Sequence, residues 1–485
     1  MMVIVQSLTA LLPVLILAFS VIVIMLSIAW NRNFFLNFIL SLVGLLLSFL
    51  SLFMVSQHTP LDINFLLRID NYSILYSGII LFFSFCTCIF SYSSLLNYHS
   101  SKDEFYLLIL LSTLGCVLLT MAVHMASLFI GFELVSLPLI GLIGYFKHYN
   151  QFLESTLKYM ILSSLTSALL LFGISLVYIG SGGLSFIELQ QAFNISSSQH
   201  IILLLFGTGI ILISFFFKLS IFPFHLWIPD VYQGATALVL TYFSTVVKIS
   251  FFIALVRFFL YLPVNKIFVL NYLCTIIAFI SILFGNIMAL FQNNLKRLLA
   301  YSSISHFGYL LIALLTCQFY PYFLETLGIY LLGYCVSNLG IFAVLNSISN
   351  LNQKFDIDQI VSYRGFYCKN PFLSVFMTIF IFSLAGIPIS LGFISKLFLL
   401  TSISMEHFWF LGFSIILGTI ISLYYYLKII IILYNNNINY SKNIQAWNII
   451  TLTNFLILLL GMINIFFGLF PNILIEIFNR CIIYL

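Results

Sequence analysis

Long apolar runs separated by short polar segments dominate this chain. A helix needs about 20 apolar residues to cross the hydrocarbon core of a bilayer. We therefore predict about fourteen transmembrane helices, near residues 3–30, 34–57, 71–97, 105–122, 125–146, 156–180, 200–222, 238–262, 268–292, 297–317, 322–349, 371–400, 407–434 and 448–470. Between two of these spans, residues 184–193 form a short amphipathic segment that is expected to lie in the membrane interface.

Two of the spans are interrupted by helix breakers. Pro223 and Pro229 follow the span at 200–222, and Gly386 and Pro388 lie inside the span at 371–400. Proline opens a helix because it cannot donate to the carbonyl one turn back, and opened backbone at membrane depth needs cover from protein or water. A kink without function is the alternative for either break alone. Paired interrupted spans, one in each half, are typical of inverted repeats around a transport path.

The composition supports an integral membrane protein. Of 485 residues, 62% are hydrophobic and only 6% are charged, against about 25% charged in an ordinary soluble domain. We expect one membrane domain, since no polar stretch is long enough for an attached soluble domain. The net charge of +5 is spread over the loops without a basic tract, so no nucleic-acid binding is expected.

The sequence carries no signature of a redox centre. The pair Cys86-x-Cys88 has the wrong spacing for a zinc clip and lies in an apolar run, so we interpret it as packing. Haem, iron–sulfur and dinucleotide-binding signatures are also missing. We therefore expect neither a cofactor nor a metal in this chain, and any redox chemistry in other chains.

Loop charges predict the orientation in the membrane. With fourteen spans, the odd-numbered loops carry Arg32, Lys102, Lys147, Lys296, Arg297, Lys354, Arg364, Lys369 and Lys442. The even-numbered loops carry little beyond Arg68 and Lys266. Positive loops face the inside, which predicts the odd loops on the matrix or cytoplasmic side and both termini opposite, on the intermembrane-space side in a mitochondrion.

The N-terminal segment shows neither a basic n-region nor an Arg- and Ser-rich transit peptide. The composition is heavy in Phe (54) and Tyr (27). That bias suits a protein made inside an AT-rich organelle and inserted locally. We predict the mitochondrial inner membrane, with plastid and bacterial origins as open alternatives.

Four ionisable residues lie well inside predicted spans: Glu133, Lys218, Lys248 and Lys396. A charge at the centre of a membrane helix costs at least about 2.5–3.5 kcal/mol on insertion scales, so such residues need partners or water and mark an ion or proton path. Snorkelling to the interface is the alternative, and it is awkward from mid-span. We predict that these four residues form a proton relay.

Other ionisable residues leave two interpretations open. Lys158 lies nearer the end of its span and Lys296 begins a helix on the inner side, so each is a relay element or an anchor. His225 lies between two prolines and His306 follows a serine-rich run, so each is a proton relay or a hydrogen-bonded packing residue. Arg257, near the end of its span, is predicted to be an interfacial anchor.

The predicted mechanism is electrostatic. A nearby carboxylate changes how readily a buried lysine holds its proton. Movement of Glu133 toward or away from Lys218 would therefore load or unload that lysine. Lys248 and Lys396 would then pass the proton onward through water.

Several long, ordered motifs carry a family resemblance. The run 217–234, FKLSIFPFHLWIPDVYQG, with Ser-Thr-x-x-Lys at 244–248, resembles the broken-helix signature of the antiporter-like subunits of proton-pumping NADH:quinone oxidoreductase, respiratory complex I. Gly-Phe-Glu-Leu around Glu133, KRLLAYSSISHFG at 296–308 and Gly-Ile-Pro followed by Gly-Phe-x-x-Lys at 386–396 match as well. Together these motifs look most like the subunit 2 branch, chain N of the bacterial enzyme.

The resemblance implies an all-α integral membrane fold of two inverted five-helix repeats with discontinuous helices. The implied domains are three N-terminal helices (1–104), a first repeat (105–262), a second repeat (263–434) and a C-terminal helix with a tail (435–485). It also implies a central hydrophilic axis. The residues placed on that axis are Glu133, Lys218, Lys248 and Lys396, with Lys158, His225, Lys296 and His306 as secondary candidates.

The implied function is proton movement in response to quinone reduction in other subunits. The implied partners are other membrane-arm subunits, especially subunits 4 and 4L, and lipids such as cardiolipin; FMN, iron–sulfur clusters and ubiquinone are expected in partner subunits. Sister subunits 4 and 5 are near alternatives, but subunit 4 has a carboxylate at the position of Lys396 and subunit 5 has a C-terminal extension. A subunit of a sodium/proton antiporter, a plastid NDH subunit and a structural membrane anchor are further alternatives.

Overall fold

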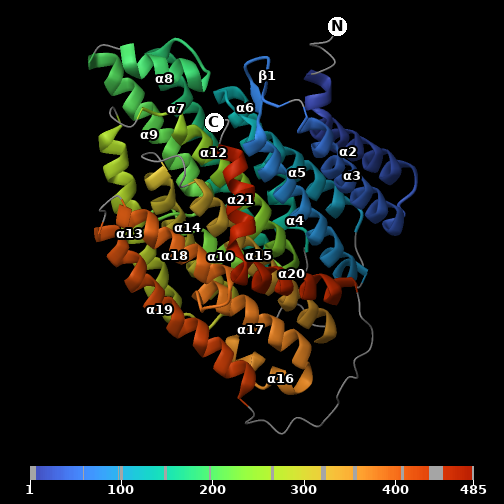
Figure 1. Ribbon diagram of the computed structural model, residues 1–485. Coiled ribbons are helices and arrows are strands. Elements are labelled where there is room, and N and C mark those ends of the chain that lie inside the picture. Colours follow the sequence, from blue (N-terminus) through green and yellow to red (C-terminus); the bar gives the residue numbers. More distant parts are fainter. Residues whose placement is uncertain are drawn as a thin grey trace. The chain divides into compact units, whose positions relative to one another are not determined.

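The structure is a computed structural model, and it is almost entirely helical (Figure 1). It describes residues 7–57, 59–96, 98, 102–146, 150–195, 198–263, 267–317, 324–352, 358–405, 409–435 and 452–482. Contacts divide the chain into two compact units. The first unit comprises residues 1–219, 245–272 and 480–485, and the second comprises residues 220–244 and 273–479.

The first unit contains most of the N-terminal helices and one small hairpin. Its elements are α2 (Leu12–Trp30), α3 (Phe34–Val55), β1 (Leu61–Ile63), β2 (Leu67–Ile69), α4 (Asn71–Leu96), α5 (Glu104–Met121), α6 (Met125–Ile143), α7 (Asn150–Ser181), α8 (Phe186–Ile195), α9 (Ser198–Leu219) and α12 (Lys248–Leu260). Helices α2, α3, α4 and α5 lie side by side (Figure 1), and α12 packs on α4, α5 and α9.

The second unit contains the short helices that follow the first break and the helices of the C-terminal half. Its elements are α10 (Ile228–Gly234), α11 (Ala237–Tyr242), α14 (Leu295–Cys317), α15 (Leu324–Asn352), the 3₁₀ helix η3 (Ile360–Tyr363), α16 (Phe366–Lys369), α17 (Pro371–Ala385), α18 (Leu391–Met405), α19 (Trp409–Tyr434), α20 (Leu452–Leu469) and α21 (Pro471–Ile482). Helix α15 is its centre, because α11, α14, α17, α18 and α20 all pack against it. The π-helical segment η1 (Phe243–Val247), α13 (Phe268–Leu290) and α21, whose residues 480–482 belong to the first unit, contribute residues to both units.

Thirteen helical segments of the described chain are long and apolar enough to cross a membrane. The shorter helices α17 and α18 together occupy the remaining predicted span at 371–400. Every one of the predicted spans therefore has a helical counterpart, and the predicted interfacial segment at 184–193 is helix α8. Of the loop cations that predicted the orientation, Lys147, Lys266, Lys354 and Lys442 lie outside the described residues.

Both predicted breaks are present. Helix α9 ends at Leu219, and Ser220 takes a left-handed backbone conformation (φ 61°) before the chain turns into α10. Helix α17 ends at Ala385 and is followed by Gly386 (φ 83°), whose amide donates to the carbonyl of Phe382 at 2.9 Å. A left-handed residue that closes the last helical turn is the usual role of glycine after a helix. Pro388 follows and prevents the helix from continuing.

A small hairpin and a C-terminal helix are among the elements that were not predicted from the sequence. Strands β1 and β2 pair antiparallel, with Asp62 opposite Arg68. The C-terminal segment, predicted as a tail, forms the amphipathic helix α21. The short hairpin carries too few alternating residues to stand out beside the long apolar runs, which explains why it was missed.

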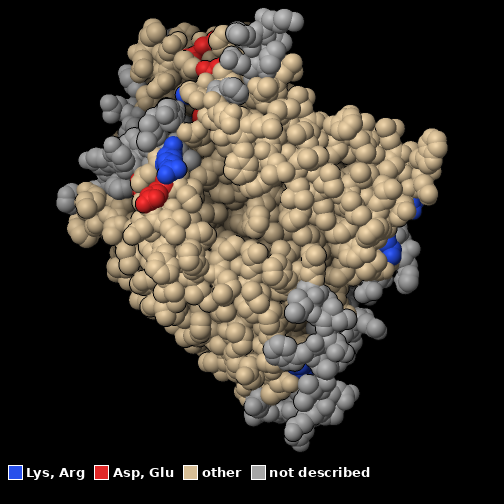
Figure 2. Space-filling view, turned by 45° about the vertical axis from the view of Figure 1, so that its right-hand side comes forward, with Lys and Arg blue, Asp and Glu red and all other residues tan. Residues whose placement is uncertain are grey.

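The surface is apolar to an extent that requires lipid. Figure 2 shows one face on which charged side chains are confined to a few scattered patches. Helices α2 and α3 expose large apolar side chains, including Phe19, Trp30 and Phe53. A protein in water rarely exposes such a continuous apolar surface, whereas a lipid-facing helix satisfies its own backbone and needs no polar partner.

Candidate functional site

Lys218 ends helix α9 in the first unit and is buried (3% exposed). Its Nζ atom lies 5.7 Å from the ring centre of Tyr159 and 5.8 Å from that of Phe251. Among the described residues, it has no hydrogen-bond partner. The negative end of the helix dipole and the two aromatic faces therefore supply the favourable electrostatics around this ammonium group.

Glu133 belongs to α6 of the same unit and is half-buried. The hydroxyl of Ser136 donates to Glu133 Oε2 at 3.3 Å. The carboxylate lies within electrostatic range of both Lys218 and Tyr159. The structure thus brings the predicted carboxylate and lysine into one environment, without a direct ion pair between them among the described residues.

Lys248 is the first residue of α12 and is 1% exposed. The segment before it, η1, is π-helical. Such single-turn irregularities widen the helix locally and are frequent at functional sites. The helical window that contains Lys248 is completely buried inside the protein.

Lys396 lies on α18 of the second unit and is 6% exposed. Its Nζ donates to the carbonyls of Leu384 and Ala385, at 2.9 and 2.8 Å. These carbonyls lie in the last turn of α17, where backbone acceptors lack helical partners and the helix dipole favours a cation. The second break therefore holds this lysine directly. A side chain at Gly386 would lie only 2.8 Å from Lys396 Cδ, which gives a second reason for glycine there.

His306, on α14, shares a small cavity with Lys396. The cavity is lined by side chains of α14, α15, α17 and α18, including Tyr330, Ser395 and these two residues. The imidazole contacts the hydroxyls of Tyr330 and Tyr426. The structure therefore brings together two sequence-predicted relay residues of the second unit.

His225 follows the first break and is 2% exposed. Its ring stacks on Phe222 at 5.3 Å between centroids and meets the edge of Phe284 at 4.6 Å. The ring is thus packed among aromatic side chains, and its buried Nδ1 has no hydrogen-bond partner among the described residues.

Lys296 begins α14 and contacts two groups of the second unit. Its Nζ lies 3.1 Å from Asp358 Oδ1 and donates to the carbonyl of Ala235 at 2.9 Å. The neighbouring Arg297 lies 3.3 Å from Asp230 of α10. These contacts fasten α14 to the short helix α10, which favours an anchoring role for Lys296.

Lys158 lies on α7 of the first unit, one turn after Glu154. The two side chains form an ion pair at 2.7 Å, and they are 40% and 66% exposed. Lys158 is therefore partly exposed and paired with a carboxylate, whereas Lys218 is buried.

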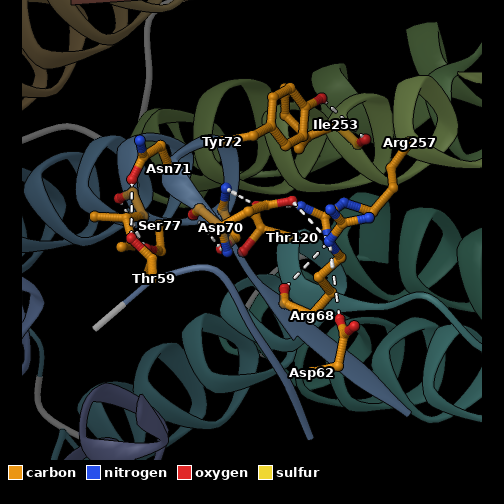
Figure 3. Close-up of polar contacts among 12 residues, drawn as sticks. Thr59, Asp62, Arg68, Asp70, Asn71, Tyr72, Ser77, Thr120, Ile253 and Arg257 are labelled. Carbon is orange, nitrogen blue, oxygen red and sulfur yellow. Dashed lines mark hydrogen bonds and ion pairs between the residues drawn. The ribbon is translucent and has the colours of Figure 1, made fainter. Parts of the chain in front are cut away.

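One buried charge cluster was missed. Arg257 Nη2 lies 2.6 Å from Asp70 Oδ1, and both side chains are almost fully buried. Arg257 Nη1 also donates to the carbonyl of Arg68 at 3.2 Å, and its guanidinium lies 5.3 Å from the ring centre of Tyr72 (Figure 3). The prediction of an interfacial anchor for Arg257 is wrong, because the side chain ends on a buried carboxylate and not in water or headgroups.

The described residues contain no group of three or more His, Cys, Asp or Glu side chains placed to hold a metal ion. Cys86 and Cys88, interpreted as packing, are both buried without a disulfide. The lysine, histidine, tyrosine and carboxylate groups of the described site are all capable of acid–base chemistry.

The fold and the buried lysines define an all-helical, multi-pass membrane protein with two interrupted helices and ionisable side chains at the breaks. The chain belongs to the family of NADH:quinone oxidoreductase/Mrp antiporter transmembrane proteins, whose pattern matches residues 122–422. This confirms the family resemblance that the sequence motifs carried.

Named relatives cover nearly the whole chain. NADH-quinone oxidoreductase subunit N of Buchnera aphidicola is 45% identical over 476 residues, which are 97% of this chain and 98% of that protein. A chain of respiratory complex I from Thermus thermophilus, solved with bound aureothin, is 28% identical with a TM-score of 0.81, covering 96% of this chain and 98% of that one. These matches confirm the predicted fold class.

More distant structures share the fold alone. A chain of the Mrp complex from a Dietzia species is 16% identical, with a TM-score of 0.83 over 98% of this chain and 97% of that one. A chain of an archaeal membrane-bound sulfane sulfur reductase is 21% identical, with a TM-score of 0.87 over 98% of this chain and 97% of that one.

Proposed function

We propose that this chain is the antiporter-like subunit N (subunit 2) of a proton-translocating NADH:quinone oxidoreductase and that it moves protons across the membrane. The observation that carries this proposal is the 45% identity to a protein of that name over 97% of the chain. It is supported by Lys218 and Lys396, which lie buried at the two helix breaks.

Within this function, we assign the proton relay to Glu133, Lys218, Lys248 and Lys396. Burial supports the three lysines, and electrostatic range to Lys218 supports Glu133. His306 is a further relay residue because it shares the cavity of Lys396. For the secondary candidates Lys158, His225 and Lys296, the contacts described above support positioning roles.

The test is Lys218→Ala in the assembled complex, reconstituted in proteoliposomes. NADH-driven proton uptake is expected to be lost, because the substitution removes a buried ammonium group of the proposed relay, while the amount of assembled complex stays the same. Lys369→Ala, at an exposed position on α16, is the matched control and should pump like wild type. Normal pumping by Lys218→Ala would contradict the proposed relay.

Copurification separates the remaining functional alternatives. A complex I subunit should copurify with flavin- and iron–sulfur-containing subunits, which hold FMN and the clusters, and with ubiquinone reductase activity. A subunit of a free-standing sodium/proton antiporter should copurify without them. A purely structural anchor would copurify with the redox subunits but tolerate loss of Lys218.

We propose that the neighbouring membrane-arm subunits 4 and 4L, together with lipids such as cardiolipin, cover part of the exposed surface. The exposed flank of α7, with the ion pair of Lys158 and Glu154, supports a contact with a subunit. The exposed apolar side chains of α2 and α3 support lipid contact. Crosslinking from a cysteine introduced on each surface would identify the neighbours.

We propose that the protein lies in a respiratory membrane with both termini on the outer side. The Phe- and Tyr-rich composition predicts the mitochondrial inner membrane, whereas the bacterial source of the named relative favours a bacterial plasma membrane. We also propose that residues 105–262 and 263–434 form two inverted repeats. Labelling of introduced terminal cysteines with an impermeant reagent tests the orientation.

A further inference from the structure

His306 is held between two tyrosine hydroxyls in the second unit. Its Nδ1 lies 2.7 Å from the hydroxyl of Tyr330 on α15, and its Nε2 lies 3.4 Å from the hydroxyl of Tyr426 on α19. Both phenols are fully buried and His306 is 4% exposed. The imidazole therefore has one phenol on each nitrogen, an arrangement that packing alone does not require.

The two phenols differ in their surroundings. Tyr330 lines the cavity that also contains Lys396 and His306, whereas Tyr426 is not among the lining residues. The cavity has about 10 Å³ of space for the centres of water molecules, which is room for roughly one water. Tyr330 and Lys396 thus line the cavity, which has room for a water, whereas Tyr426 contacts the other ring nitrogen from outside the lining residues.

We propose that Tyr330 and Tyr426 are further proton-carrying residues, and that Tyr330, His306 and Tyr426 form a phenol–imidazole–phenol proton wire leading away from the Lys396 cavity. This inference rests on the proposed proton-translocating function. It adds two residues that the sequence did not mark, on two helices other than that of His306.

One proton leaves the wire for each proton that enters it. A neutral imidazole has one N–H donor and one bare acceptor nitrogen. In the starting state Tyr330 donates its O–H to bare Nδ1, and Nε2–H donates to the oxygen of Tyr426. A proton arriving from cavity water binds the Tyr330 oxygen as the original hydroxyl proton passes to Nδ1. The Nε2 proton then passes to the Tyr426 oxygen, whose own proton leaves to a water or hydroxyl acceptor beyond.

After one transfer the ring carries its proton on Nδ1 instead of Nε2. A second proton can follow in the same direction only after the ring has rotated so that its protonated nitrogen faces Tyr426 and its bare nitrogen faces Tyr330, and after the two hydroxyls have reoriented. This reset breaks and remakes hydrogen bonds only, and in the transfer itself only O–H and N–H bonds form and break. No oxidant, reductant or metal takes part. The rotation limits the wire to one proton per reset.

The two contacts of the His306 ring differ in length, and the longer one identifies the slow proton transfer. The Nδ1 contact of 2.7 Å is a short hydrogen bond, whereas the Nε2 contact of 3.4 Å exceeds the usual range for nitrogen–oxygen bonds. The difference is 3.4 − 2.7 = 0.7 Å. A movement of α19 or of the ring by about that amount would close the contact, so the Tyr426 side is the gated half of the wire.

The neighbouring phenols provide a matched control. Tyr425, next to Tyr426 on α19, is also fully buried, but its hydroxyl donates to Asn286 Oδ1 at 3.0 Å. Tyr425→Phe therefore removes one buried hydroxyl and its bond to Asn286, keeps the ring that packs on Tyr426 at 4.4 Å between centroids, and leaves both phenol contacts of His306 in place. Any cost of losing a buried phenol appears equally in Tyr425→Phe and Tyr426→Phe.

The experiment measures NADH-driven proton uptake, and its solvent deuterium isotope effect, in proteoliposomes of the assembled complex carrying Tyr330→Phe, Tyr426→Phe or Tyr425→Phe. A positioned proton-transfer group typically contributes about 10²–10⁴-fold to a rate, part of which water can replace. We therefore expect the first two variants to lose about tenfold or more, with a larger isotope effect, while Tyr425→Phe stays near wild type. The amount of assembled complex in the membrane shows whether each variant folds.

The other possible results contradict either the proton wire or the proposed function. Equal losses in all three variants would mean that the phenols are structural. Normal pumping by Tyr330→Phe and Tyr426→Phe, with pumping abolished by Lys218→Ala, would refute the wire and leave the proposed function intact. Normal pumping by Lys218→Ala as well would refute the proposed function itself.

Discussion

Removal of one partner from the buried ion pair of Asp70 and Arg257 should weaken the first unit strongly. The pair joins the residue before α4 to the last turn of α12, at 2.6 Å and with both side chains at most 2% exposed. Asp70 also accepts a hydrogen bond from the backbone amide of Ser73 in the first turn of α4, at 2.8 Å. Asp70→Asn keeps the shape and the acceptor but removes the negative charge.

The magnitude follows from burial. Leaving one charge of a buried pair without its partner costs about 3–5 kcal/mol, whereas replacing both partners by apolar groups of similar size is often neutral. Asp70→Asn should therefore cost about 3 kcal/mol, the lower end, because the amide oxygen still accepts a hydrogen bond. Asp70→Leu combined with Arg257→Met should cost less than the sum of the single changes by about 2–3 kcal/mol.

Hydrogen exchange in the assembled complex measures this locally. A loss of about 3 kcal/mol raises the opening constant by about 100-fold, since 1.4 kcal/mol corresponds to a factor of ten. The faster exchange should appear in the first turn of α4 and the last turn of α12. Asp62→Asn is the control: Asp62 lies 3.8 Å from Arg68 but is 65% exposed, and an exposed pair is worth only about 0–1 kcal/mol.

Equal amide exchange rates in the Asp70→Asn and Asp62→Asn variants would contradict this prediction, because burial would then have no effect on the energy of the pair. The functional consequence is also measurable. Lys248 begins α12 nine residues before Arg257, about 13.5 Å along the helix axis. A loosened end of α12 should therefore lower proton pumping without removing any relay residue.

Two further predictions concern substitutions at the second helix break and in helix α8. Gly392→Ala should lower the free energy of unfolding by about 1–3 kcal/mol and impair pumping, because the added carbon would collide with the carbonyl of Ser383. Gly412→Ala is the control, because a carbon added there meets only ordinary contacts. It should be neutral in the same thermal-unfolding and pumping assays. In α8, the backbone amide of Ser185 donates to Glu188 at 3.0 Å and lowers the pKa of that carboxyl. This stabilisation is present above the unfolded pKa of about 4.3 and is lost as the pH falls through the lowered folded pKa. The backbone amides of α8 should therefore exchange faster at acid pH. Glu188→Gln should show no such pH dependence.

Sequence patterns predicted the membrane spans well because lipid imposes a simple rule. Each spanning helix must be apolar and of nearly fixed length, so runs such as 34–57 and 409–434 appear directly in the sequence. The breaks were predictable for an equally local reason, since Pro223, Gly386 and Pro388 change the backbone wherever they occur. The amphipathic helix α21 was missed because its short length and polar content resemble a tail.

Partners of charged side chains were far less predictable, because they come from distant parts of the chain. Asp70 and Arg257 are 187 residues apart in sequence. The one available signal was topological: with fourteen spans, the start of the third and the end of the eighth face the same side, so an acid and a base there can meet. Tyr330 and Tyr426 offered no signal at all, since a tyrosine in a span is indistinguishable from an apolar packing residue.

Position along a helix therefore does not decide whether a membrane lysine carries protons or anchors the chain. Lys158 and Lys296 lie within ion-pair distance of carboxylates, which stabilise the charged form and keep the proton in place. Among the described residues, Lys218 and Lys396 form no ion pair and are held by aromatic faces and helix-end carbonyls. We expect these weaker partners to stabilise the ammonium without locking it, so that in the proposed relay the proton leaves when a carboxylate or water moves. In this proposal the kind of partner, which only the folded chain reveals, separates a relay lysine from an anchor.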